Sequence, residues 1–314
     1  MRIKIVKTLK RREFFQLALA VTSAMSFSSF SLLAKNGEGG PLKKMIPSSK
    51  EEIPAIGMGT WRTFNVGEDP KARQIRLKIL KAFFDYGGGM VDSSPMYGSS
   101  EEIIGYCLKN LEKSKGLFSA TKVWTPFGQE GQEQVKNSHD LWGIDQFDLL
   151  QVHNLVSWQE HLEMLFEMKK QGKVKYVGIT TSHGRRHEEF EKVMKKMPLD
   201  FVQFSYNILD REAEERLIPL AKEKKMAVIA NRPFRTKELI YQFQDKPLPN
   251  WASEIDCENW PQFLLKFIIS HPDITCTIPA TSQIPHMHEN MKAGRGKMPD
   301  EKIRKKMAAY VRSL

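Results

Sequence analysis

Eight short apolar segments alternate with helical patterns along this chain from Ile53 onward. Several of them are dense in valine, isoleucine and phenylalanine without strict alternation, which is typical of parallel strands buried on both faces. Eight strands that are each followed by a helix form a barrel more naturally than an open sheet. The sequence therefore predicts an α/β fold, a single-domain (β/α)8 TIM barrel, with strands at 55–60, 89–92, 118–122, 147–152, 174–180, 200–205, 226–230 and 274–278.

The segments between these strands carry the apolar spacing of amphipathic helices. Residues 260–268, for example, place large apolar side chains at positions i, i+3, i+4, i+7 and i+8, which form one buried face. The longest irregular stretch runs from Asn231 to Glu258 after the seventh strand, and its length suggests a substrate-binding loop. No strand leads into a G-x-G-x-x-G turn, so a nucleotide would not be held as in a Rossmann fold.

The composition limits the classes of partner. The 314 residues are 41% hydrophobic, which supports one large core, and residues 1–34 contribute +5 of the net charge of +11. The remaining positive excess is small and no RNA- or DNA-binding motif is present, so nucleic acid is not an expected partner. Cys107, Cys257 and Cys276 are too scattered for a disulfide framework, and no pair has metal-ligand spacing. We therefore expect no metal site.

The first 34 residues have the composition of a signal peptide. Arg11 and Arg12 precede Phe14, and a mildly apolar run, diluted by serines, extends from Leu17 to Leu33. This arrangement resembles a twin-arginine export signal, and the serines make the run a poor permanent membrane span. An amphipathic N-terminal helix is the structural alternative.

The expected organisation follows from these segments. Residues 1–34 form a twin-arginine-type signal peptide, 35–50 a flexible linker rich in lysine, glycine and serine, 51–298 the barrel and 299–314 a C-terminal helical tail. We expect the twin-arginine export machinery to be a partner and the mature protein to be periplasmic, without a stable membrane anchor. If the signal is not used, the protein is cytoplasmic.

Four polar residues stand where predicted strands end. Asp92 and Tyr97 follow the second strand, Lys122 closes the third and His153 follows the fourth. Each alone has an ordinary structural explanation, such as a helix cap or a packed core histidine. In a parallel barrel, however, these strand ends all lie on the face where active sites are built. A carboxylate, a phenol, an ammonium and an imidazole that converge there suit proton delivery to a carbonyl group.

The motifs around these residues make the chain similar to the aldo-keto reductase family. The resemblance runs from about Ile53 to Ala293, and its motifs occur in order with barrel spacing. Any one of them is weak, and together they are strong. They are 57–61, 91–98, 120–122, 150–153, 172–180, Gln203 with Tyr206 and Asn207, and 278–282 with Glu289 and Asn290.

The resemblance implies a role for each of the four polar residues. Tyr97 is the general acid that donates a proton to the carbonyl oxygen while a reduced nicotinamide delivers hydride. Lys122 lowers the pKa of that phenol and is itself held and kept charged by Asp92. His153, as a neutral imidazole, binds and orients the carbonyl oxygen.

The resemblance also implies a cofactor site, with NADP(H) as the cofactor and NAD(H) left open. Gln203 matches the residue that binds the nicotinamide carboxamide, and Thr181 stands where an asparagine is usual. Asn231 replaces the aromatic residue that stacks on nicotinamide, and Arg232 is expected to meet the pyrophosphate. The expected cofactor-binding residues are Gly59, Thr60, Trp61, Thr180, Gln203, Arg232, Thr281, Ser282, His286, Glu289 and Asn290.

The expected substrate is a small carbonyl compound. Trp61, Met96, Trp124 and the 231–258 loop, with Trp251, are the candidate walls, and they suggest an apolar substrate. Two alternatives stay open: a cofactor-binding redox-sensing or partner-binding module with little turnover, and a family member whose cofactor site is degraded.

Overall fold

The computed structural model describes residues 40–111 and 116–314. The predicted signal peptide lies outside the described residues. Within the described part of the chain, no helix combines the length and the apolar character needed to cross a membrane.

Eight parallel strands form one sheet whose strands are neighbours in chain order from β3 to β10. The first and last strands meet through bridges from Ile56 to Thr277 and from Gly59 to Ala280, so the sheet closes into a barrel. The prediction of a (β/α)8 barrel is therefore confirmed. The strands are β3 Met58–Gly59, β4 Met90–Asp92, β5 Phe118–Val123, β6 Phe147–Val152, β7 Val174–Thr180, β8 Phe201–Ser205, β9 Ala227–Asn231 and β10 Cys276–Thr277.

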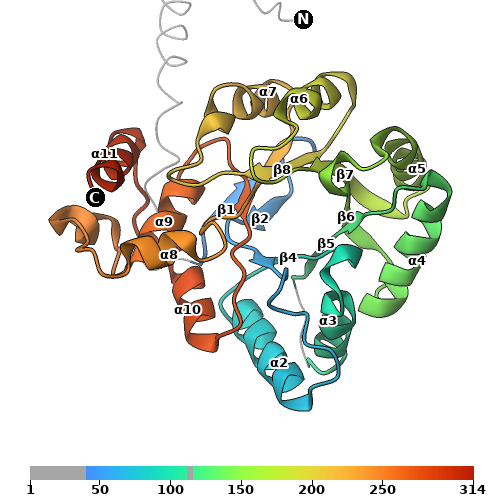
Figure 1. Ribbon diagram of the computed structural model, residues 1–314, viewed down its shortest axis with the longest axis horizontal. Helices are drawn as coiled ribbons and strands as arrows, with labels where there is room; N and C mark the ends of the chain where they lie inside the picture. Colours follow the sequence, from blue (N-terminus) through green and yellow to red (C-terminus); the bar gives the residue numbers. More distant parts are fainter. Residues whose placement is uncertain (1–39, 112–115) are drawn as a thin grey trace, which may run out of the picture. The chain divides into compact units, whose positions relative to one another are not determined.

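A ring of helices surrounds these strands, as Figure 1 shows. The helix α2 begins after Asp69, whose side chain accepts hydrogen bonds from two backbone amides, and α9 begins after Asn259, whose side chain accepts one from Gln262. The helices that follow successive barrel strands are α2 Pro70–Asp85, α3 Ser100–Lys109, α4 Gly131–Trp142, α5 Trp158–Lys170, α6 His187–Lys196, α7 Leu217–Glu223, α9 Trp260–Ile269 and α10 Ile284–Lys292.

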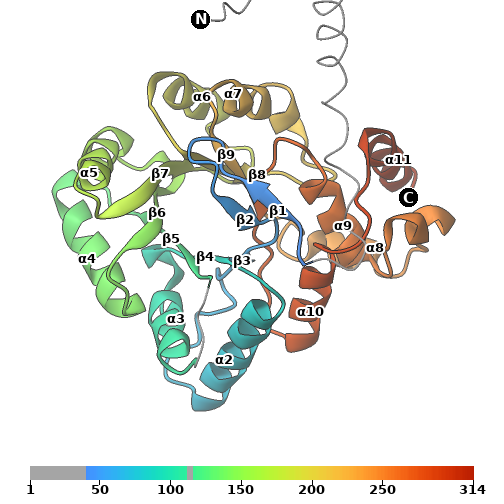
Figure 2. The ribbon, with the colours of Figure 1, turned by 180° about the vertical axis from the view of Figure 1, so that it is seen from behind.

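Part of the segment predicted to be a linker is a β-hairpin. Strand β1 (Lys43–Met45) pairs with β2 (Glu52–Pro54) in an antiparallel register, and Figure 2 shows the pair on the side opposite to the view of Figure 1. Ile46 and Ile53 are buried in the same apolar cluster as side chains from the barrel strands. The prediction of a flexible linker at 35–50 is therefore wrong for these residues, because two apolar side chains anchor them to the barrel.

The long segment after β9 is not one irregular loop. It contains the helix α8 (Glu238–Phe243) and a 3-10 turn, η5 (Asn250–Ile255). Trp251, which the sequence suggested as a substrate wall, packs against Phe263 of α9 and Tyr310 of α11 (Glu301–Arg312). That interpretation is wrong, because the C-terminal helix covers this tryptophan. Arg304 fixes α11 by donating to Phe267 O at 3.1 Å and to Tyr206 Oη at 2.7 Å.

Helices α3 and α4 meet at a glycine, and this contact gives a stability prediction. A Cβ atom at Gly105 would lie 1.9 Å from the backbone oxygen of Leu141, so Gly105→Ala should lower the free energy of unfolding by about 1–3 kcal/mol. At Gly294 the same added atom would meet only ordinary contacts at 3.5 Å, so Gly294→Ala is the matched control. Urea unfolding measures both variants, and equal stability of the two would contradict the close approach.

Candidate active site

The four residues singled out in the sequence meet at one end of the barrel. Asp92 ends β4, Lys122 lies near the end of β5, and His153 directly follows β6 in the turn η3 (His153–Leu155). Tyr97 ends η1 (Pro95–Tyr97), a 3-10 turn that Ser94 caps by accepting a hydrogen bond from the backbone N–H of Met96. Asp92, Lys122 and His153 are 2%, 1% and 6% exposed, whereas Tyr97 is half-buried. Tyr97 therefore forms the solvent side of the group.

An ion pair at the bottom of this site joins two neighbouring strands. Lys122 Nζ lies 2.6 Å from Asp92 Oδ1 and donates a second hydrogen bond of 2.6 Å to Ser93 O. Burial lowers the pKa of Lys122, while Asp92 and Glu101 oppose that effect. A buried ammonium is stable only when its donors are satisfied, and both partners here come from the end of β4.

Two glutamine side chains complete the environment of Asp92. Gln151 Nε2 of β6 lies 3.3 Å from Asp92 Oδ2, and Gln203 Nε2 of β8 lies 3.0 Å from the same oxygen. The sequence resemblance assigned Gln203 to the nicotinamide, and in this structure its amide nitrogen is bound to Asp92. Gln151 was not expected as a site residue, although a glutamine in the apolar run of β6 was the available signal. The carboxylate is thus held from three other strands.

The imidazole of His153 and the phenol of Tyr97 lie side by side. Their ring centroids are 5.7 Å apart with an edge-on geometry. Ser94 Oγ lies 2.9 Å from His153 Nδ1, and the sequence motifs did not predict this contact. Burial and then the charge of Lys122 lower the pKa of His153 well below its usual value, so the imidazole is neutral. This is the state in which it can bind a carbonyl oxygen through an N–H group.

The pKa of Tyr97 is raised, whereas the sequence predicted that Lys122 would lower it. Burial raises the pKa of Tyr97, and the negative charge of Asp92 raises it further. Lys122 Nζ lies 5.4 Å from the centre of the Tyr97 ring, and Asp92 largely balances its charge. The prediction of a lowered pKa is therefore wrong for the protein alone. Tyr97 is a protonated phenol, which is the form that donates.

The ends of β7, β8 and β9 form the side on which a nicotinamide was expected. Asn231, at the position of the expected aromatic residue, accepts from Ser205 Oγ at 2.8 Å and donates to Thr181 O at 2.9 Å. It therefore ties three strands together rather than offering a ring for stacking. Next to it, Arg232 donates to Thr236 Oγ1 at 3.1 Å, and among the described residues it forms no ion pair. Thr180 Oγ1 accepts from the backbone of Asn154 at 3.1 Å.

The residues predicted to hold the phosphate and adenine ends of the cofactor follow β10 and continue into α10. Thr281 Oγ1 accepts from the backbone N–H of Gln283 at 3.1 Å, Ser282 is half-buried and His286 is exposed. Asn290 is buried, and Glu289 accepts hydrogen bonds from Asn259 and Gln262 at the start of α9. Glu289 therefore already has protein partners in this structure.

The predicted cofactor-binding residues around β3 are closely packed. A Cβ atom at Gly59 would lie 2.8 Å from Ile278 O, so a larger residue would disturb the closure between β3 and the last strand. Thr60 is fully buried and donates to Asp92 O at 2.9 Å. The guanidinium of Arg62 lies 4.5 Å from the ring centre of Trp61. Thr60 thus helps to hold Asp92 in position.

Two apolar residues lie next to the catalytic residues in the chain and are exposed. Met96 is 37% exposed and Trp124, two residues after Lys122, is 42% exposed. Met96 and Trp124 thus stay predicted walls of an apolar substrate site.

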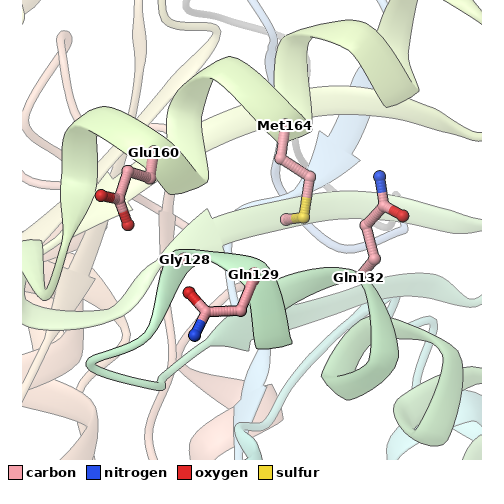
Figure 3. A pocket seen from close by; sticks show the side chains of 5 residues that line it. All are labelled: Gly128, Gln129, Gln132, Glu160 and Met164. Atoms are coloured by element: carbon pink, nitrogen blue, oxygen red, sulfur yellow. The ribbon is translucent and has the colours of Figure 1, made fainter.

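A hollow lies outside this site, between the start of α4 and α5. Figure 3 shows Glu160 and Met164 on one side of it and Gln129 and Gln132 on the other. Its volume is about 390 Å³, and none of the four polar residues lines it. Within residues 40–111 and 116–314, no group of three or more histidine, cysteine, aspartate or glutamate side chains could hold a metal ion.

Comparison with known proteins places this site in a class. The model of the aldo/keto reductase family matches residues 55–310, so the chain belongs to this family of oxidoreductases. Aldo-keto reductase YhdN of Bacillus subtilis is 32% identical over 196 residues, which span 57% of each chain. Methylglyoxal reductase YeaE of Escherichia coli is 25% identical over 254 residues, 79% of this chain and 88% of its own.

Solved structures share the fold. An aldo/keto reductase from Klebsiella pneumoniae, crystallised with NADP and acetate, superimposes with a TM-score of 0.72. It is 23% identical, and the match covers 85% of this chain and 95% of the other. At this identity the likeness establishes the barrel and its strand order, while the site rests on the side chains described above.

A pair of substitutions tests how strongly Lys122 and Asp92 stabilise each other. Lys122→Met leaves Asp92 buried without its cation and should lower the free energy of unfolding by about 3–5 kcal/mol. Adding Asp92→Asn should recover most of that loss, because the uncompensated charge is removed. Urea unfolding of both single variants and the double variant measures the coupling, and a double variant no more stable than Lys122→Met would contradict a mutual pair.

Proposed function

We propose that this protein reduces an aldehyde or ketone, with hydride from a reduced nicotinamide cofactor and a proton from Tyr97. One observation carries the proposal. A protonated, half-buried phenol lies beside a neutral imidazole, and both stand above a buried Lys122–Asp92 pair. This arrangement can bind a carbonyl oxygen, protonate it and stabilise the anion that remains.

The carbonyl oxygen is first bound and then protonated by these residues. His153 and Tyr97 both donate hydrogen bonds to it, and the contact from Ser94 Oγ to Nδ1 leaves the other nitrogen of the imidazole for the substrate. A bound reduced nicotinamide supplies the hydride to the carbonyl carbon. As the oxygen becomes basic, Tyr97 transfers its proton, and the resulting phenolate is stabilised by the ammonium of Lys122.

The side chains of β8 and of the segment after β9 fit such a cofactor. Gln203 is buried in the middle of β8 with an amide that can exchange its bond to Asp92 for a carboxamide partner. Arg232 is a partly buried guanidinium that donates to Thr236, and it could also bind a pyrophosphate. Asn231 offers no aromatic surface, so we expect nicotinamide to be held by hydrogen bonds on this side.

We infer NADP(H) as the cofactor and a small carbonyl compound as the substrate. The structures from Klebsiella pneumoniae hold NADP in one crystal and NADPH in another. Another relative, 27% identical over 231 residues, is an NADH-specific methylglyoxal reductase of Escherichia coli, so NAD(H) is the competing cofactor. Methylglyoxal is a suitable first substrate, because two of the relatives are named for it.

The proton donor is tested by Tyr97→Phe. The ring stays and the hydroxyl is lost, so turnover of methylglyoxal should fall by at least about 100-fold. Cofactor binding should stay within about twofold of wild type, because Tyr97 lies on the substrate side. Fluorescence titration with NADPH and NADH measures binding, and the consumption of reduced cofactor measures turnover.

Tyr241→Phe is the matched control for that experiment. Tyr241 is 64% exposed on α8, so loss of its hydroxyl should leave binding and turnover unchanged. Equal turnover in Tyr97→Phe and Tyr241→Phe would refute the assignment of the acid. Tight cofactor binding without turnover in wild type would favour a redox-sensing module instead.

We also propose that residues 1–34 direct the chain to the twin-arginine machinery and that the mature protein is periplasmic. The support is the sequence alone: Arg11 and Arg12, the following phenylalanine and a serine-diluted apolar run. Export in the folded state agrees with a reductase that must acquire its cofactor in the cytoplasm.

The export proposal predicts the fate of a double substitution. Changing Arg11 and Arg12 together to lysine keeps the charge but removes the guanidinium pair, so the protein should remain in the cytoplasm. Cell fractionation followed by immunoblotting measures the periplasmic fraction, with the Lys7→Arg variant as a control of similar charge. An unchanged periplasmic yield would show that the pair is not an export signal.

A further inference from the structure

A second buried carboxylate lies behind the active site, on the outer side of the barrel wall. Glu101 is in the first turn of α3 and is only 1% exposed. Its Oε1 accepts from Thr121 Oγ1 at 2.6 Å and from Trp142 Nε1 at 3.1 Å, and its Oε2 accepts from Ser138 Oγ at 3.0 Å. The indole N–H can only donate. The contacts therefore suit an ionised carboxylate.

The shortest of these contacts joins Glu101 to β5, the strand that also carries Lys122. Thr121 directly precedes Lys122 on β5, and successive side chains of a strand point to opposite faces. Thr121 thus points outward to Glu101, while Lys122 points into the barrel toward Asp92. Glu101 is also four residues after Tyr97, across one turn and the start of α3.

We propose that Glu101 is a positioning residue that keeps Lys122 protonated through the alkaline part of the working range. The proposal rests on the proposed reduction, in which the ammonium of Lys122 stabilises the phenolate of Tyr97. Asp92 alone neutralises Lys122, but it also opposes the formation of a phenolate nearby. A second carboxylate on the far side of β5 holds the proton on Lys122, and the barrel wall separates it from the substrate.

The electrostatic effects agree with this geometry. Burial lowers the pKa of Lys122 and raises that of Glu101, and the two charges oppose these shifts in each other. Each group therefore makes the charged form of the other less costly. In a buried setting such an interaction is much stronger than at the surface.

The other charged groups on the elements around α3 are engaged elsewhere or exposed. On α2, Arg73 pairs with Glu102 and Arg76 donates to Thr63 O. On α4, His139 contacts Ile144 O, while Glu133, Lys136 and Asp140 are exposed. The remaining neighbours are Asp92 of β4, Tyr97 of η1, Cys107 and Lys109 of α3, and Asp148 of β6, which pairs with Lys175.

The alternative is that Glu101 only fastens α3 to α4 through Ser138 and Trp142. That role depends on hydrogen bonds, whereas the proposed role depends on charge. The two can be separated, because one substitution removes the charge and another removes a hydrogen bond but keeps the charge.

The deciding experiment is the pH dependence of kcat/KM for Glu101→Gln. Loss of the carboxylate removes a charge that raises the pKa of Lys122, so the alkaline limb of the profile should move to lower pH by about one unit. Ser138→Ala keeps the charge and removes one donor, so its limb should stay at the wild-type position. Glu102→Gln, at the exposed next residue, is the second control.

Each outcome bears on the proposal. A shifted limb in Glu101→Gln alone supports it. A lower rate with an unshifted limb, or an equal shift in Ser138→Ala, overturns it in favour of a purely structural role. If Tyr97→Phe keeps full turnover, the proposed acid fails independently of these profiles.

A direct measurement covers the case in which Glu101→Gln does not fold. Infrared spectroscopy of the wild-type chain at pH 8, with Glu101→Asp and Ser138→Ala as references, reports whether the buried carboxyl is ionised. An ionised group is expected, and the absorption of a protonated carboxyl that is assigned to Glu101 would overturn the proposal without any assay of activity.

Discussion

The buried pair of Asp92 and Lys122 is the interaction on which the rest of the site depends. An ammonium without water around it is costly, so the surrounding strands supply its acceptors and fix its carboxylate. Gln151, Gln203 and Thr60 contact Asp92 from β6, β8 and the end of β3. Because these partners come from separate strands, the closed barrel is itself a condition for the charge pair.

The opposite end of the barrel is covered by the β1–β2 hairpin. The β1–β2 hairpin buries Ile46 and Ile53 in the apolar cluster that fills the barrel. Tyr176 of β7 donates to Glu51 Oε2 at 2.8 Å, and this hydrogen bond fastens the turn between β1 and β2 to the barrel. The barrel is thus closed to water on one side, while Met96 and Trp124 leave apolar surface exposed on the catalytic side.

The sequence predicted the barrel and the meeting of the four polar residues, because strand ends in a parallel barrel share one face. It missed the hairpin, because a segment rich in lysine and serine resembles a linker. Only two isoleucines in this part of the chain indicate that it is partly buried. It also missed Ser94, Gln151 and Glu101, whose roles depend on contacts across strands and helices. The raised pKa of Tyr97 required knowledge of burial, which the motif does not carry.

The central claim is that hydride and proton reach the carbonyl from different donors, the cofactor and Tyr97. The most direct test is reduction of methylglyoxal with NADPH deuterated at the transferable position of the nicotinamide. Mass spectrometry of the product should show one deuterium bound to the former carbonyl carbon, because the cofactor delivers the hydride to that carbon. A product without carbon-bound deuterium would contradict the account.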